Sequence, residues 1–165
     1  AHPFGTSKAV PYNKQFFVGG PNSIRAWKIK ALGPGAYRDQ NYFFANYQTG
    51  DIKLEFNAEY RFTMLRFSKY KMEGAFFVDA GNVWLLENDP LRENANITWN
   101  FWKQIAIGTG LGARFDFNIF LIRFDLGIKL YDPNPDSYIW LYEKNPIRNF
   151  SITDVVLNLA VNYPF

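Results

Sequence analysis

The sequence DIKLEFNAEYRF, residues 51–62, alternates polar and apolar side chains without exception. A period of two places successive side chains on opposite faces of an extended backbone. The polar row comprises Asp51, Lys53, Glu55, Asn57, Glu59 and Arg61, and the apolar row comprises Ile52, Leu54, Phe56, Ala58, Tyr60 and Phe62. The pattern therefore predicts a β-strand with one polar face and one apolar face.

Four further segments with this alternation follow along the chain. They are predicted at 72–84, about 103–117, 119–131 and 152–165. Their apolar rows include Phe76, Val78, Ile107, Leu111, Phe124, Leu126, Leu157 and Leu159. Short connections at 63–71 and at Asn118 alternate with long polar connections at 85–100 and 132–151. This arrangement predicts an all-β, antiparallel up-and-down meander whose two ends face different environments.

Residues 1–50 have a different texture from the strand region, 51–165. They contain the turn-rich runs Gly19-Gly20-Pro21-Asn22-Ser23 and Gly33-Pro34-Gly35, and their apolar residues keep no sustained period. We expect a long ordered loop with short extended pieces. Loops of this length are uncommon and usually functional.

Alternation alone fits two opposite architectures. In a soluble ligand-binding β-barrel the apolar rows point inward, whereas in an outer-membrane barrel they point outward to lipid. The strands are about ten to thirteen residues long, which suits tilted membrane strands better than soluble ones. Glycines Gly108, Gly110 and Gly112 share one polar row, and aromatic residues gather near the strand ends. These features favour a transmembrane β-barrel, with the soluble barrel as the alternative.

About five strands are too few to close a membrane barrel, since known barrels have at least about eight. Open strand edges in lipid would cost several kcal/mol for each unpaired backbone group. The sequence also begins at Ala1, within a turn-rich stretch. We therefore expect the C-terminal portion of a larger barrel, with an N-terminal portion missing from this sequence.

Composition excludes several other classes of function. The chain has 165 residues, no cysteine, a single histidine and a net charge of +3. A disulfide scaffold, a Cys-ligated or His-based metal site and a Ser-His-Asp site therefore have no material. The charge is too small to indicate nucleic-acid binding, and no run of 18 apolar residues predicts a transmembrane helix. We expect no enzymatic activity, no cofactor and no metal.

Two motifs carry charged residues in unusual places. FVGGPNSIRAW, residues 17–27, contains Arg25, and FVDAGNVW, residues 77–84, contains Asp79 in the middle of a predicted strand. A carboxylate in a narrow barrel interior needs a cation, and the fork of an arginine binds a carboxylate bidentately. Glu59, on the neighbouring polar row, could lie near the same site. The alternative is that Arg25 and Asp79 are each solvated.

The order of these motifs resembles the C-terminal end of the BamA/TamA superfamily, the bacterial surface antigen family. FVGGPNSIRAW is followed by LGPG, AEYRF, FFVDAGNVW, GTGLGARFDF, RFDLGIKL and a terminal NYPF. The loop is most similar to TamA-like members of the lipoprotein type (TamL). The resemblance implies a sixteen-stranded barrel preceded by periplasmic POTRA repeats, with this chain as the sixth extracellular loop (1–50) and the last five strands (51–165).

The resemblance also implies roles for individual residues. The arginine of the family's VRG-aromatic loop tip resembles Arg25, and the F-x-D-x-G motif with which it pairs resembles Phe77, Asp79 and Gly81. A strand glutamate that faces this arginine resembles Glu59. The implied tip motif comprises Gly19, Gly20, Ser23, Ile24, Ala26 and Trp27, with Ala26 in place of the usual glycine. The strand glycines would leave room for the inserted loop, and Tyr163 and Phe165 resemble the C-terminal signal of barrel proteins.

The function implied is that of an outer-membrane assembly or translocation factor. The barrel would open at a seam between its first and last strands and pass client polypeptides into the membrane. The implied partners are outer-membrane lipid, the missing barrel strands and POTRA repeats, client outer-membrane polypeptides and a periplasm-spanning partner. Within the same superfamily, a polypeptide-secretion pore and a barrel that anchors an enzyme domain are the alternatives.

Overall fold

The computed structural model describes residues 10–37, 48–67, 70–117, 119–133, 139–140 and 155–162. The strands are β1 (Ile52–Phe67), β2 (Tyr70–Trp84), β3 (Ala106–Asp116), β4 (Leu121–Asp132), β5 (Ile139–Trp140) and β6 (Val155–Asn162). Two short 3-10 helices, η1 (Tyr12–Lys14) and η3 (Phe101–Gln104), complete the regular structure of this part of the chain. The all-β prediction is confirmed for the described residues.

Within those ranges, no helix has the length and apolar character needed to cross a membrane.

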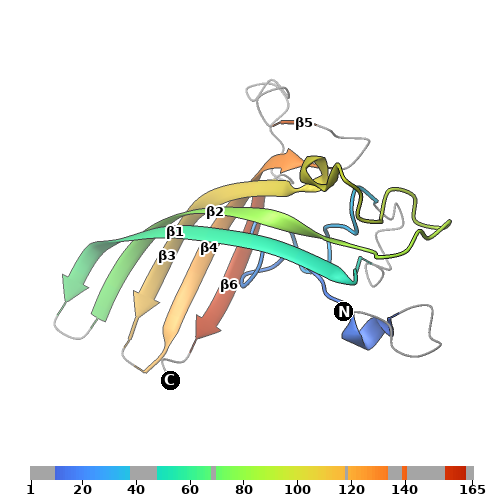
Figure 1. Ribbon diagram of the computed structural model, residues 1–165. Coiled ribbons are helices and arrows are strands. Elements are labelled where there is room, and N and C mark those ends of the chain that lie inside the picture. The colour runs from blue at the N-terminus through green and yellow to red at the C-terminus, as the bar shows by residue number, and fades with distance from the viewer. Residues whose placement is uncertain are drawn as a thin grey trace.

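The long strands form one antiparallel sheet. β1, β2, β3 and β4 pair in chain order, and β6 pairs with β4 over Leu121–Ile128. The short β5 pairs with β4 only at Tyr131 and Asp132. Figure 1 shows β1, β2, β3, β4 and β6 side by side in a curved sheet. The predicted antiparallel meander is thus confirmed for this sheet.

The strand bounds differ from the predicted ones in several places, and β2 begins at Tyr70, two residues before the predicted start. β1 continues past 62 to Phe67, and its register with β2 shifts between Thr63 and Leu65. This irregularity interrupts the alternation without ending the strand, which is why the strict alternation did not predict the last residue pairs between β1 and β2. The third strand begins at Ala106 and not at 103, because residues 101–104 form η3. The predicted connection 132–151 contains β5.

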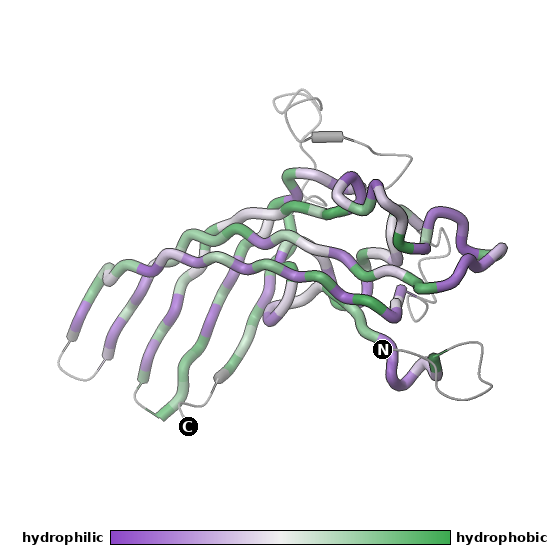
Figure 2. Tube along the Cα trace, viewed as in Figure 1, coloured by the Kyte–Doolittle hydropathy of each residue, from purple (hydrophilic) through white to green (hydrophobic). Residues whose placement is uncertain are grey.

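The two faces of the sheet have opposite characters. On the outer face, apolar side chains are exposed. They include Leu54, Phe56, Tyr60, Phe62, Phe76, Leu111, Phe124, Leu126, Leu157, Leu159 and Val161. Figure 2 shows hydrophilic and hydrophobic residues alternating along the strands. Contiguous exposed apolar area of this kind is rare on a soluble monomer, and it is the reverse of a soluble barrel with its apolar rows packed inside.

Part of the inner face, toward one end of the sheet, is covered by the N-terminal loop, for which the structure describes residues 10–37 and 48–50 (Figure 1). Its apolar side chains pack against the ends of β2 and β3 in a buried cluster. The cluster comprises Val18, Ile24, Ala26, Trp27, Leu32, Val83 and Ala106. The backbone amide of Gly35 donates to the carbonyl oxygen of Val83 at 2.7 Å, and the Asn82 side chain donates to the carbonyl of Gly35 at 2.8 Å. The loop is therefore fixed on the sheet by packing and by hydrogen bonds.

Candidate functional site

The loop tip, residues 19–27, is a closed turn that requires glycine at its start. Gly19 and Gly20 have φ angles of 98° and 91°, a region that glycine adopts readily. A Cβ on Gly19 would lie 2.1 Å from the carbonyl oxygen of Lys28. The amide of Gly20 donates to the carbonyl of Trp27 at 2.8 Å, and the amide of Gly19 donates to the Ser23 hydroxyl at 3.0 Å. The predicted tip residues therefore form one compact unit.

Polar side chains of β1 bind this tip. The Ser23 hydroxyl donates to the carboxylate of Glu55. The side-chain amide of Asn57 donates both to the carbonyl of Ser23, at 3.0 Å, and to Oδ1 of Asp79, at 2.9 Å. Asn57 therefore joins the tip, β1 and β2 at one point.

The structure brings Arg25 and Asp79 together in the bidentate geometry of a guanidinium and a carboxylate. Nε of Arg25 donates to Oδ2 of Asp79 and Nη2 donates to Oδ1, both at 2.8 Å. The backbone amide of Arg25 also donates to Oδ2, at 3.0 Å. Arg25 is 5% exposed and Asp79 0%, and the guanidinium lies 3.6 Å from the ring centroid of Phe77. The buried carboxylate therefore has its hydrogen-bonding capacity met by donors of the protein itself.

Glu59 completes the predicted set and is shared by three arginines. Its carboxylate lies 2.5 Å from nitrogens of Arg25, Arg114 and Arg61. Burial alone would lower the pKa of Arg25, but its hydrogen bonds with Asp79 and Glu59 outweigh that effect and raise the pKa above the ordinary value. Arg25 therefore keeps its charge.

A second group of charged side chains, on β3 and β4, also belongs to this site and was not predicted from the sequence. Nη2 of Arg114 contacts Glu59 and also lies 3.4 Å from Oδ1 of Asp125. Arg123 lies 2.8 Å from Oδ2 of Asp125 and donates to the Pro21 carbonyl at the loop tip. These residues stand in the polar rows of the predicted strands, so the sequence carried a signal. Their meeting depends on strand register, which pairs Gly112 with Asp125 and Arg114 with Arg123.

The glycines of β3 make room for three different groups. A Cβ on Gly108 would lie 2.5 Å from Cβ of Ala26, on Gly110 it would lie 2.4 Å from the Phe77 ring, and on Gly112 it would lie 2.4 Å from Oδ1 of Asp125. Of these three, Gly108 is the one that faces the loop. Gly81, which has a φ of 156°, would bring a Cβ to 2.3 Å from the Leu54 carbonyl on β1.

Ala26, which stands where the resemblance leads one to expect glycine, fits the tip without strain. Its φ is not among the positive values of the described residues, so a Cβ is tolerated there. That methyl group occupies the space above Gly108. We therefore predict that Gly108→Ala lowers the free energy of unfolding by about 1–3 kcal/mol through overpacking, measured by urea unfolding of the full-length protein. The double variant Gly108→Ala/Ala26→Gly should recover most of the loss, and failure to recover would contradict this contact.

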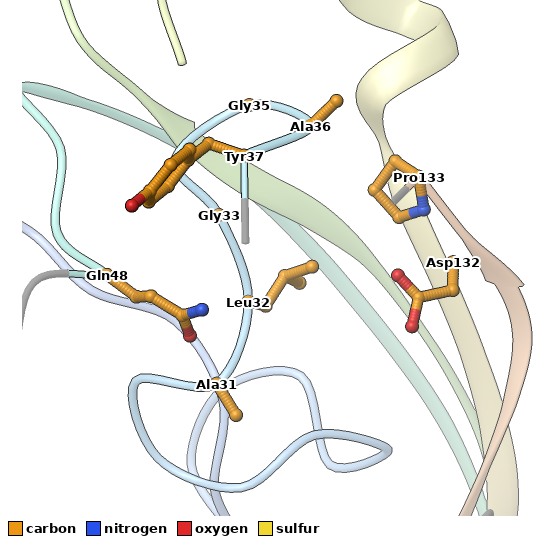
Figure 3. Close-up of a pocket in the computed structure, with 9 residues that line it drawn as sticks. All are labelled: Ala31, Leu32, Gly33, Gly35, Ala36, Tyr37, Gln48, Asp132 and Pro133. Carbon is orange, nitrogen blue, oxygen red and sulfur yellow. The ribbon is translucent and has the colours of Figure 1, made fainter. Parts of the chain in front are cut away.

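A small pocket lies beside the loop at the far end of β4. Figure 3 shows Leu32, Tyr37 and Gln48 on the loop side and Asp132 and Pro133 on the strand side. Among the described residues, no cluster of His, Cys, Asp and Glu side chains could hold a metal ion. Each of the three guanidinium nitrogens of Arg25 contacts a carboxylate of β1 or β2, which attaches the loop tip to the sheet. Tyr163 and Phe165, the predicted C-terminal signal, lie outside the described residues.

Comparison with known families places these features in context. The profile of the Omp85 superfamily domain matches residues 1–153. The match thus spans the N-terminal loop, both charged motifs and the strands up to the start of the last one. No solved structure matches the chain.

Proposed function

The chain belongs to the Omp85 superfamily, whose members insert or translocate proteins at the bacterial outer membrane, and we propose that it is the barrel portion of an outer-membrane protein assembly factor. This membership supports the resemblance to the BamA/TamA superfamily. Within it, the loop motifs favour the TamL type. The superfamily is one of insertion and translocation factors and not of enzymes, and the proposal assigns no catalytic residue.

The observation that carries the proposal is the opposite character of the two sheet faces. The loop tip is bound to the inner face by Arg25, Asp79 and Glu59, while the apolar rows are exposed on the outer face. Acyl chains would cover such rows, as they cover the outside of a membrane barrel. Because open edges are not tolerated in lipid, we propose that the free edge of β1 pairs with a further strand of a sixteen-stranded barrel. Residues 1–50 would then be a loop in the interior of that barrel.

The proposed mechanism places the seam of this barrel at β6. An edge strand presents unpaired amides and carbonyls, and a client strand can pair with them by β-augmentation. The client would then enter the membrane with its backbone groups paired. The proposed partners are lipid, POTRA repeats of the same protein, client outer-membrane polypeptides and a periplasm-spanning partner.

Disulfide cross-linking tests the seam directly, because the sequence has no cysteine of its own. We predict that Leu159→Cys, on the outer face of β6, cross-links in membranes to a client that carries single cysteines along one strand. Since side chains alternate between faces, the cross-links should recur at every second client position. The matched control is Leu111→Cys on β3, whose two neighbours β2 and β4 already pair with it. Equal cross-linking of both variants would reject the seam at β6.

A further inference from the structure

The side chain of Asn158 connects β6 to the loop tip. Asn158, on β6, is buried, and its Nδ2 donates to the backbone carbonyl of Arg25 at 2.8 Å. The side chain of the same Arg25 binds Asp79 on β2 and Glu59 on β1. One residue of the tip therefore contacts both the first strands of the sheet and its last one.

The tip can reach Asn158 because β4 has a glycine beneath it. A Cβ on Gly127 would lie 2.6 Å from the carbonyl oxygen of Arg25 and 2.9 Å from Cα of Ala26. Gly127 pairs with Val156, and Asp125 pairs with Asn158. The backbone of the tip thus rests on β4 at the position that brings the Arg25 carbonyl within reach of β6.

Within the part of the chain that the structure describes, β6 pairs with one strand, β4, over Val155–Asn162. Its side chains Leu157 and Leu159 are exposed on the outer face. A strand with one paired neighbour gains part of its order from each buried hydrogen bond on its inner face.

We propose that Asn158 is a positioning residue that couples the loop tip to the edge strand. While the tip lies on Gly127, the Asn158 amide fixes β6 against β4. When the tip moves away, this bond is lost and β6 loosens, so the position of the loop controls the order of the strand that would receive a client. The inference rests on the function proposed above, because that function supplies the client strand that the edge of β6 would receive.

Hydrogen exchange of the full-length protein in lipid measures the order of β6 directly. Asn158→Ala should speed exchange of the β6 amides roughly fivefold, the effect of one net hydrogen bond, with β1 and β2 unchanged. Asn158→Asp keeps the size of the side chain but removes the donor, and it should loosen β6 at least as much. Gly127→Ala should loosen β6 by lifting the tip, with little further effect in an Asn158→Ala background.

A matched control removes a comparable bond elsewhere in the sheet. Thr109 donates from its hydroxyl to the Phe77 carbonyl at 2.7 Å, so Thr109→Val should leave β6 exchange unchanged. Wild-type exchange in Asn158→Asp, or equal loosening of β1, β2 and β6, would overturn the coupling. If β6 loosens as expected and client insertion also slows about twofold or more, both the coupling and the seam stand. If β6 loosens while insertion is unchanged, the coupling stands and the seam function is rejected.

Discussion

Asp79→Ala is expected to lower the free energy of unfolding of the full-length protein by roughly 3–5 kcal/mol, because it leaves a buried guanidinium without its main partner. Asp79 is fully buried and accepts two hydrogen bonds from the Arg25 side chain and one from its backbone. Glu59 remains as a partner, but Arg61 and Arg114 already contact it. Urea unfolding measures the loss, and protease cleavage within residues 19–27 should become faster because the tip is released.

The partly exposed pair Asp89–Arg92 provides the matched control. Its nitrogen–oxygen distance of 2.7 Å is close to that of the buried pair, yet Asp89→Ala should cost no more than about 1 kcal/mol, because water screens the charges. Equal effects of Asp79→Ala and Asp89→Ala would mean that the buried pair does not brace the loop.

A double-mutant cycle separates the pair from its surroundings. Replacing both charges by apolar side chains, as in Arg25→Met/Asp79→Leu, removes the uncompensated charge. The double variant should therefore be more stable than the sum of the single losses predicts, with a coupling of about 1–3 kcal/mol. Additive losses would assign the effect of Asp79 to its contact with Asn57.

The faces of the sheet could be predicted from the sequence, whereas the contacts across it could not. The alternation at 51–62 predicts which side chains share a face, and the exposed positions of Leu54 and Phe56 agree with it. The residue types alone left open whether Arg25 pairs with Asp79. The resemblance in the order of the motifs predicted the pair. Alternation is a local property, whereas a contact between residues 54 positions apart depends on the path of the loop.

The other contacts of the site were not predicted for the same physical reason. Arg114 and Asp125 stand in predicted polar rows, but whether they meet depends on the register of β3 with β4. Gly127 stood in the polar row of its strand, and its use becomes visible only when the backbone of Arg25 lies on it. The extension of β1 to Phe67 follows an irregular pairing after Thr63, which a strict period of two cannot represent.

Leu111→Arg is expected to destabilise the protein by about 2–4 kcal/mol, the cost of a cation near the middle of a bilayer on the lipid face of a barrel. Leu111 lies in the middle of β3 and is 62% exposed. Its cross-strand neighbours Phe76 and Leu126 are also exposed on the outer face. In water, the same change at so exposed a position would alter stability by no more than about 0.5 kcal/mol. Urea unfolding and refolding in lipid vesicles measures the difference.

Two further positions convert this prediction into a test of depth. Trp99, in the connection 85–100, is 91% exposed, and Trp99→Arg should be nearly neutral because the side chain would lie outside the hydrocarbon. Ile119 is exposed beside the tight turn between β3 and β4, so Ile119→Arg should cost about 0–1 kcal/mol, the value near an interface. A cost that falls from Leu111 to Ile119 to Trp99 is the order expected of a sheet whose strands cross a bilayer. If the three substitutions cost the same, the outer face does not contact acyl chains, and the exposed apolar rows require a protein partner instead.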